Sequence, residues 1–316
     1  MNIRHLTFRL LQVFVSVVTT GSYSEAARRL HLTQPTVSQQ LKRLAEAVGV
    51  PLFTAQGNQW QLTDAGRELY RACVDVLGRF DDFDDYLSEL EAGKKGRFSI
   101  ALVNTAQYVL PRILGPYSHA FPQVEVTVEI GNRQQVLARF DRQLDDLYVF
   151  SHPPASEATC AGRFLRNPLV VVAPKGHPKA ESEHLSLSHL LDERFLLREP
   201  GSASRMLFES WLQSQGLTLG ATLQMASNEA IRIGVSSGMG LAVLSRHVLP
   251  AQDVGLTILP VEGFPLESHW HFIARRDCRL PRAAFGFLQF VEQSLDQCLD
   301  PQWTENHVGD MLKSLG

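Results

Sequence analysis

The chain has 316 residues, of which 44% are hydrophobic and 20% charged, and its formal net charge is −3. These values are ordinary for a globular protein and leave room for two or three domains, each with its own core. The sequence has no run of about eighteen apolar residues, which argues against a membrane-spanning helix. Its first residues also lack the pattern of a signal peptide, so we expect a cytoplasmic protein with no membrane partner.

The charge is distributed unevenly along the chain. Residues 1–63 contain six Lys and Arg against two Glu, whereas residues 64–91 contain three Arg against nine Asp and Glu. The rest of the chain is nearly balanced. A basic N-terminal unit favours contact with phosphates, and the remainder of the protein has no such bias.

Three helices are predicted at the N-terminus. Residues 6–18 carry apolar side chains at helical spacing, and Thr-Thr-Gly at 19–21 ends this segment. Residues 22–49 then predict two short helices joined by a tight turn. Ser22 with Glu25 has the spacing of a capping box for the first, and Thr33, Pro35 and Gly49 suit the two ends of the second.

The second of these two helices is amphipathic. Val37, Leu41, Leu44 and Val48 form an apolar stripe, and the opposite face carries amide, hydroxyl and cationic groups but no acid. Gln can bond an adenine edge, and Lys or Arg can reach guanine or phosphate, so this face is typical of the recognition helix in a helix-turn-helix. A solvated helix is the alternative. The expected DNA contacts are Ser24, Arg28, Thr33, Gln34, Pro35, Thr36, Ser38, Gln39, Lys42 and Arg43.

Residues 50–92 are expected to complete this unit and to pair two copies of it. Apolar segments on either side of a polar turn at 54–59 predict a two-stranded wing. Beyond the wing, apolar residues recur at alternating steps of four and three, which is typical of a coiled coil, so we expect a long helix that dimerises. The seam comprises Leu62, Gly66, Leu69, Cys73, Val76, Phe80, Phe83, Leu87 and Leu90, and Gly93-Lys94-Lys95-Gly96 follows it.

Strand-like and helix-like segments alternate after residue 96, which predicts α/β structure with mainly parallel sheets. So many strands would make an unusually broad sheet, so two subdomains are expected. The expected strands cover 98–103, 124–130, 147–150, 169–173, 195–197, 221–225, 241–244, 256–259 and 269–274. The expected helices cover 107–120, 132–140, 187–191, 204–215, 229–236 and 282–298.

From about residue 3 to about residue 298 the chain resembles the LysR-type transcriptional regulators. The resemblance rests on Phe14-x8-Tyr23-Ser-Glu-Ala-Ala27, Leu32-Thr-Gln-Pro-Thr-Val-Ser-Gln39, Leu52-Phe53, Leu62-Thr-Asp-Ala-Gly66, Arg198-Glu-Pro-Gly-Ser202 and Ser227-Asn-Glu-Ala230. Thr105-Ala-Gln-Tyr-Val-Leu-Pro-Arg112 and Asp145-Asp-Leu-Tyr-Val149 are most similar to the branch that activates Calvin-cycle carbon-fixation genes. Many members carry arginines in the wing, whereas Ala55, Gln56, Asn58 and Gln59 occupy it here.

The resemblance implies a multidomain α+β protein that forms homodimers or homotetramers. It implies a winged helix-turn-helix domain at 1–61, a linker and dimerisation helix at 62–92, and at 97–300 an effector-binding domain with the fold of periplasmic binding proteins. Subdomain I of that domain would comprise about 97–165 and 266–300, and subdomain II about 166–265. Residues 301–316 are polar and expected to be a loose tail. The implied partners are double-stranded DNA, a small metabolite bound between the subdomains, a second copy of the chain and RNA polymerase.

Two segments have the residues to bind a small anion. Gly201-Ser-Ala-Ser-Arg205 follows a predicted strand and opens a helix, so its amides, hydroxyls and guanidinium can converge on one ligand. Asn104 and Thr105 stand in the same relation to the first strand of the domain, and Ser151 follows another strand. Ordinary helix capping explains these residues equally well. The expected effector contacts are Asn104, Thr105, Ser151, Ser202, Ser204 and Arg205.

We expect no enzymatic activity, metal site or cofactor. His269 and His271 share one strand face but have no third ligand nearby in the sequence, and the four cysteines form no Cys-x-x-Cys pair. Gly238-Met-Gly240 lies between a predicted helix and a strand, the reverse of the order in a dinucleotide site, and no Gly-x-Ser-x-Gly motif occurs. Two alternatives remain: the C-terminal half is only an oligomerisation module, or the protein is a solute-binding protein or α/β enzyme with an added helical segment.

Overall fold

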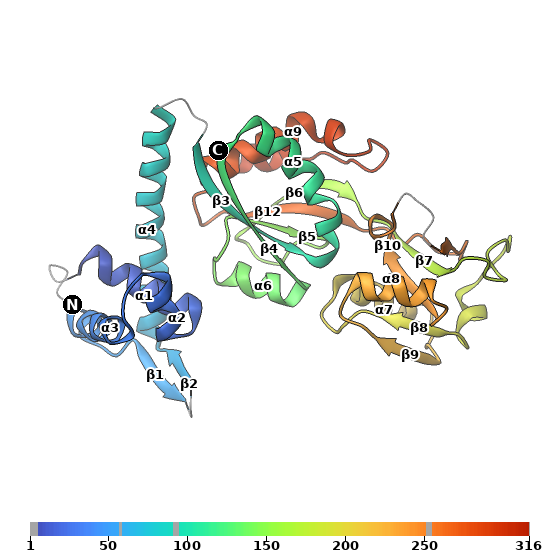
Figure 1. Ribbon diagram of the computed structural model, residues 1–316, viewed down its shortest axis with the longest axis horizontal. Coiled ribbons are helices and arrows are strands. Elements are labelled where there is room, and N and C mark those ends of the chain that lie inside the picture. Colours follow the sequence, from blue (N-terminus) through green and yellow to red (C-terminus); the bar gives the residue numbers. More distant parts are fainter. Residues whose placement is uncertain (1–5, 57–58, 91–94, 251–254, 316) are drawn as a thin grey trace. The chain divides into compact units, whose positions relative to one another are not determined.

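The computed structural model describes residues 6–56, 59–90, 95–250 and 255–315. The chain divides into two compact units, Met1–Ala92 and Gly93–Gly316, and Figure 1 traces both from the blue N-terminus to the red C-terminus. Within residues 6–56, 59–90, 95–250 and 255–315, no helix is long and apolar enough to span a bilayer.

The first unit is built from three helices, a two-stranded wing and a long helix. The helices α1, α2 and α3 cover Phe8–Thr20, Tyr23–Arg29 and Gln34–Val48, the strands β1 and β2 cover Phe53–Gln56 and Gln59–Leu62, and α4 covers Asp64–Leu90. The two strands pair antiparallel. The winged helix-turn-helix is therefore present as the sequence predicts.

The helix ends follow the predicted capping residues with one exception. Ser22 Oγ accepts from Glu25 N at 3.3 Å, Thr33 Oγ1 accepts from the backbone N–H three residues on at 3.4 Å, and Gly49 ends α3 with a φ of 87°. The second hydrogen bond predicted for the capping box, from the Ser22 N–H to the Glu25 carboxylate, is wrong. The Glu25 carboxylate pairs with the Arg28 guanidinium instead of the Ser22 N–H, because a charged partner one helical turn away makes the stronger hydrogen bond.

One core joins the elements of this unit. Phe14 of α1 and Val37 and Leu44 of α3 are fully buried. Phe53 and Trp60 of the wing pack edge to face, with ring centroids 4.8 Å apart, against the same core. The wing is thus braced by the helices, and the apolar face predicted for α3 is confirmed.

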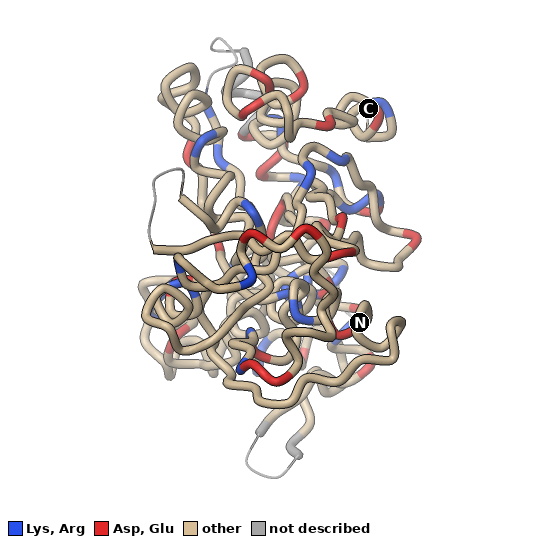
Figure 2. The backbone as a smooth tube through the Cα atoms, turned by 90° about the vertical axis from the view of Figure 1, so that its right-hand side faces the viewer, with Lys and Arg blue, Asp and Glu red and all other residues tan. Residues whose placement is uncertain are grey.

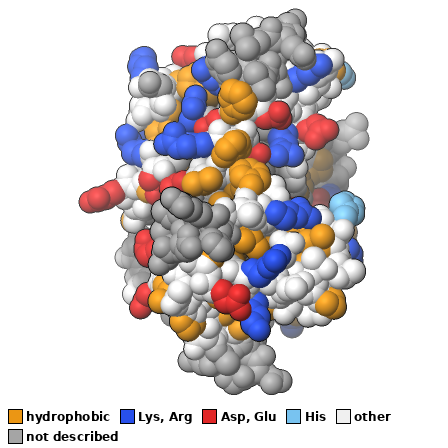
Figure 3. Space-filling model, turned by 90° about the vertical axis from the view of Figure 1, so that its left-hand side faces the viewer, with side chains coloured by type: hydrophobic (Ala, Val, Ile, Leu, Met, Phe, Trp, Pro, Cys, Tyr) orange, Lys and Arg blue, Asp and Glu red, His pale blue; other side chains and the backbone are white. Residues whose placement is uncertain are grey.

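The apolar seam of α4 divides into two parts. Leu69 packs against the core of this unit and Cys73 is only 2% exposed, so the prediction that the whole seam faces another helix is wrong for its first half. The helices of the same chain already cover that half. Val76, Phe80 and Phe83 are instead 41%, 57% and 57% exposed, and Figure 3 shows a column of hydrophobic side chains along the upper part of this face. The side chains of Leu87 and Leu90 lie outside the described residues.

The second unit contains two five-stranded sheets with helices packed on them (Figure 1). Subdomain I contains β3 (Lys95–Val103), β4 (Gln123–Gly131), β5 (Leu147–Phe150), β6 (Thr159–Arg166) and β12 (His269–Arg275). Subdomain II contains β7 (Leu169–Pro174), β8 (Arg194–Leu197), β9 (Ala221–Gln224), β10 (Leu241–Ser245) and β11 (Leu256–Ile258). Figure 2 shows basic and acidic positions interspersed along the backbone.

Helices connect and cover these strands. The α-helices are α5 (Leu110–Ala120), α6 (Arg133–Asp141), α7 (Ala203–Ser214), α8 (Asn228–Ser236), α9 (Arg282–Cys298) and α10 (Val308–Leu315). The 3₁₀ helices are η2 (Asn104–Tyr108), η3 (Leu187–Leu190) and η4 (Arg246–Val248).

Both sheets are mixed, which corrects the expectation of mainly parallel sheets. In the order β4-β3-β5-β12-β6, β3 is parallel to β4 and β5, and β12 is antiparallel to both of its neighbours. In the order β11-β7-β10-β8-β9, β8 is parallel to β9 and β10, and β7 is antiparallel to β10 and β11. The antiparallel strands are those next to the points where the chain passes between subdomains. One of them, β6, was not predicted, because its glycine and two arginines obscure the alternation of apolar residues.

A buried polar network joins the two chain segments that cross between the subdomains. Asn167 N donates to Ser268 O at 2.6 Å, and Ser245 Oγ donates to Asn167 Oδ1 at 2.6 Å. All three residues are buried. Hydrogen-bonded polar groups thus hold the crossings side by side without the dense apolar packing of a domain core.

The C-terminal segment is not a loose tail. Val308, Met311 and Leu312 of α10 are buried in the core of subdomain I, and Glu305 N donates to Phe164 O of β6 at 3.0 Å. Polar composition was misleading here, because three apolar residues at helical spacing are enough to fix a short amphipathic helix on a sheet.

We expect the two halves of the α4 seam to respond differently to charge. Val76→Lys should weaken self-association, since an ammonium would enter a helix pair, while the exposed position leaves the monomer folded. Leu69→Lys should instead lower the stability of the first unit by about 1–3 kcal/mol. Sedimentation and thermal unfolding measure the two effects. Asp75→Lys, also exposed on α4 but outside the seam, is the control, and an oligomer unchanged by Val76→Lys would contradict the assignment.

Candidate functional site

The residues predicted to contact DNA lie on one accessible surface of the first unit. Every one of the ten is exposed except Thr36, which is half-buried and whose hydroxyl lies 2.8 Å from that of Thr33. The apolar face of α3 is held by buried Val37, Leu41 and Leu44, so the polar face must point outward. This is the geometry that a major-groove helix requires.

The charges on this surface are not equally available. In the described part of the chain, Lys42 and Arg43 have no carboxylate within 4 Å, whereas Arg28 is paired with Glu25. That hydrogen bond lowers the pKa of the Glu25 carboxyl and raises the pKa of the Arg28 guanidinium. Lys42 and Arg43 are therefore the cations freest to meet phosphate.

In subdomain I the residues predicted to contact an effector lie at the carboxyl ends of neighbouring parallel strands. The β3 strand pairs with β4 up to Val103 and Gly131, and with β5 at Leu102 and Val149. The residues that follow these strands therefore meet at one edge of the sheet, where ligands bind in open α/β sheets. They include Asn104, Thr105 and Ser151, as predicted, and also Arg133 at the start of α6.

Arg198 follows β8 directly and so lies at the corresponding strand end in subdomain II. Its guanidinium is 3% exposed, pairs with Glu199 at 2.8 Å and 3.0 Å, and donates to Asn228 Oδ1 at 2.5 Å. When the Asn104 amide is oriented to satisfy both of its groups, its oxygen accepts from Arg198 Nη2 at 3.0 Å and its nitrogen donates to Gly131 O at 3.3 Å. Arg198 thus links the two subdomains at the predicted site.

The prediction that Arg205 faces the ligand needs correction. Its guanidinium donates to Glu209 Oε1 at 2.6 Å, to Arg198 O at 2.8 Å and to Gln224 Oε1 at 3.1 Å, so it is held by its own subdomain. The Glu209 carboxylate, one helical turn further along α7, pairs with the Arg205 guanidinium. Ser202 and Ser204 do lie together, with their hydroxyl oxygens 3.1 Å apart.

Arg133 was missed by sequence reasoning. Its Nη1 donates to His152 O at 2.6 Å, and its guanidinium lies 5.3 Å from the centre of the Phe150 ring. Burial lowers its pKa, and among the described residues no carboxylate lies within 4 Å of it. The signal was present in the sequence, because Arg133 follows a predicted strand and opens a predicted helix, as Asn104 does.

Comparison with known proteins identifies the family. Residues 91–296 match the LysR substrate binding domain, and residues 8–67 match the bacterial regulatory helix-turn-helix of the lysR family. The chain belongs to the LysR family of transcriptional regulators. It is therefore a DNA-binding regulator and not an enzyme, as predicted, and the solute-binding protein and α/β enzyme alternatives are set aside.

Its relatives include regulators of the RuBisCO operon. The chain is 37% identical to the HTH-type transcriptional activator CmpR of Synechocystis over 91% of its own length and 95% of that protein. It is 38% identical to the RuBisCO operon transcriptional regulator of Acidithiobacillus ferrooxidans over 92% and 95%. The resemblance to Calvin-cycle gene activators is thereby confirmed.

Two solved structures bear on the fold. The regulatory domain of Synechocystis PCC6803 CcmR in complex with 2-PG is 34% identical with a TM-score of 0.60, over 62% of this chain and 96% of that one. Full-length OxyR from Pseudomonas aeruginosa has a TM-score of 0.72, over 95% of this chain and 98% of that one. It is only 20% identical, so it supports the fold alone.

We expect Gln34→Ala and Lys42→Ala to weaken operator binding in different ways. If Gln34 contacts a base edge, its loss should cost ~1–3 kcal/mol on the true operator and little on unrelated DNA. If Lys42 contacts phosphate, its loss should weaken binding to the operator and to unrelated DNA alike. The slope of log affinity against log salt concentration should then fall by about one. Titrations of labelled DNA at several salt concentrations distinguish the two, with Glu46→Ala on the same helix as the control. Unchanged isotherms for both variants would show that this face does not contact DNA.

Proposed function

We propose that this regulator controls genes of CO₂ fixation in response to a small anion bound between its effector subdomains, with 2-PG (2-phosphoglycolate) as the leading candidate. The observation that carries the proposal is Arg133, a half-buried guanidinium at the edge where the strands of subdomain I end, with no carboxylate partner among the residues that the structure describes. The complex of the related CcmR domain with 2-PG supports the class of ligand.

The surroundings of Arg133 suit a phosphate or carboxylate. A guanidinium removed from water is costly unless an anion compensates it, and a bidentate anion makes the strongest compensation. Arg198 already has Glu199 and Asn228, so Arg133 is the cation with capacity to spare. Asn104, Thr105, Ser151, Ser202 and Ser204 supply further polar groups from both subdomains.

Such a ligand would act on the contact between the subdomains. Asn104 is the partner of Arg198, so an anion that engages Asn104 or Arg133 changes the balance of interactions across this junction. A ligand shifts a conformational equilibrium only through such differential contacts. We propose further that the bound ligand changes the spacing of the paired DNA-binding units. The regulator would then contact RNA polymerase at the promoter. It would act in the cytoplasm, where the DNA is.

We expect Arg133→Gln to weaken 2-PG binding about ten- to a hundredfold, because one charge-assisted pair contributes roughly 1.5–3 kcal/mol. Ser204→Ala should cost less, since a neutral hydroxyl bonds more weakly. Calorimetry on the full-length chain measures both. Arg194→Gln, an exposed arginine of subdomain II away from this edge, is the matched control.

Affinity for 2-PG unchanged by Arg133→Gln would place the anion elsewhere. No detectable binding of 2-PG to the wild type would reject this effector. DNA affinity without effector should be the same for all three variants, because the first unit is untouched. A changed DNA affinity would contradict the assignment of DNA binding to the first unit and effector binding to the second.

A further inference from the structure

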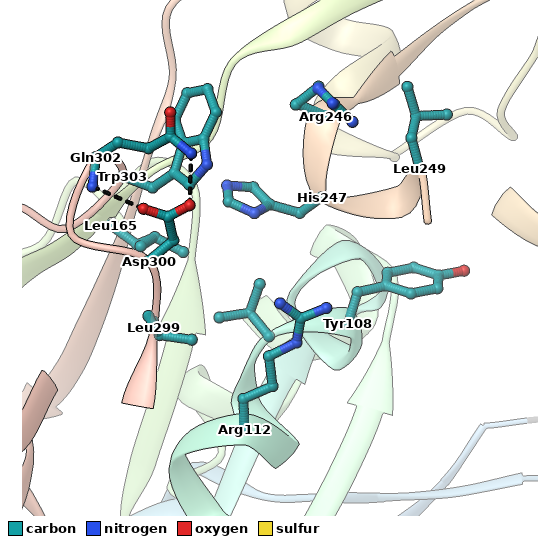
Figure 4. Close-up of a pocket in the computed structure, with 11 residues that line it drawn as sticks. Tyr108, Arg112, Leu165, Arg246, His247, Leu249, Leu299, Asp300, Gln302 and Trp303 are labelled. Carbon is teal, nitrogen blue, oxygen red and sulfur yellow. Dashed lines mark hydrogen bonds between the residues drawn. The ribbon is translucent and has the colours of Figure 1, made fainter. Parts of the chain in front are cut away.

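A separate cavity of about 310 Å³ lies in the effector domain where the two subdomains join (Figure 4). Its walls come from η2 and α5 of subdomain I, from η4 of subdomain II and from the segment after α9. The residues that matter are Tyr108, Arg112, Arg246, His247, Asp300 and Trp303. None of them belongs to the site proposed above, and the volume reaches the lower end of the range for small-molecule sites, ~300–1,000 Å³.

Two arginines line this cavity, Arg112 and Arg246. In the described part of the chain, neither Arg112 nor Arg246 makes a side-chain hydrogen bond or an ion pair. The acid in the same wall, Asp300, accepts from Gln302 N at 3.1 Å and from Gln302 Nε2 at 2.5 Å and pairs with neither arginine. Figure 4 shows the Arg112 side chain rising from α5 toward the His247 ring and Arg246 on the far side of that ring. The cavity therefore carries an excess of positive charge.

The His247 ring provides an aromatic wall between them. Its Nε2 lies 2.8 Å from Arg166 O, so this nitrogen carries the proton and donates it. The centre of the His247 ring lies 5.2 Å from the ring centre of Trp270 and 5.7 Å from that of Trp303. Burial, and then the charges of Arg112 and Arg246, lower the pKa of His247. At neutral pH the ring is therefore uncharged, and both arginines lie close enough to act on it.

We infer that this cavity binds a phosphorylated small metabolite, with the phosphate bound jointly by Arg112 and Arg246 beside the His247 ring and the carbon part against the aromatic and aliphatic wall. Guanidinium groups reaching it from both subdomains can share the oxygens of one tetrahedral anion, whereas a planar carboxylate suits a single fork. Val109, Leu165, Leu299 and Trp303 supply the apolar surface.

Such a ligand would affect the first site without touching it. Tyr108 is the last residue of η2, and the first residue of the same short helix, Asn104, is the partner of Arg198. Arg246 follows β10 directly, beside the crossing held by Ser245 and Asn167. An anion that draws Arg112 and Arg246 together thus bridges the subdomains and couples to the effector site.

Inorganic phosphate is the probe, titrated into the full-length chain by calorimetry in chloride at constant ionic strength. Arg112→Gln and Arg246→Gln should each weaken phosphate binding about ten- to a hundredfold. Arg194→Gln should leave it unchanged, and Arg133→Gln should retain this site. Acetate, the carboxylate probe, should bind more weakly than phosphate. Because neither cavity arginine has a side-chain partner among the described residues, thermal unfolding should be unaltered in Arg112→Gln and Arg246→Gln.

Three outcomes would overturn the inference: no phosphate binding by the wild type at millimolar concentration, phosphate affinity in both cavity variants equal to that of the wild type, or loss of all phosphate binding in Arg133→Gln alone. The coupling has its own test. Saturating phosphate should change the affinity of the wild type for 2-PG by a different factor from that in Arg112→Gln, where only direct competition at the first site remains. The proposed function is tested separately, because 2-PG binding by Arg112→Gln without phosphate depends only on the first site.

Discussion

The buried guanidinium of Arg198 is the interaction on which the effector domain depends. A charge that is 3% exposed must have partners, and it takes Glu199 and Asn228 from its own subdomain and Asn104 from the other. Leaving one member of a buried pair without its partner typically costs ~3–5 kcal/mol, so Glu199 fixes Arg198 in place. The remaining contact, to Asn104, joins neutral and charged groups and is the part that a ligand can exchange.

The crossings between the subdomains follow the same logic. Asn167, Ser245 and Ser268 satisfy one another in a buried network instead of forming an apolar core. The two sheets keep separate hydrophobic cores on either side of this network. Arg246 and His247, directly after Ser245, place the second cavity at this junction.

The long helix α4 serves two structures at once. Its first turns belong to the core of the winged unit, where a Cβ on Gly66 would lie 2.2 Å from Leu52 O, so only glycine allows this approach. Its later turns expose Val76, Phe80 and Phe83, which a lone helix would leave in water. A single heptad pattern therefore gives intramolecular packing in one half and an exposed apolar surface in the other.

The sequence by itself determined the elements with strong local signals: the capped helices of the winged unit, the polar face of α3, the parallel strands around β3 and the family. It also indicated which strand ends carry polar residues. The tertiary structure decided what depends on neighbours distant in the chain. Glu209 and Gln224 hold Arg205, Arg198 reaches Asn104 across the subdomains, and α10 packs on β6. Local spacing cannot rank such partners, because the choice among competing hydrogen bonds is made only when the whole fold brings them within reach.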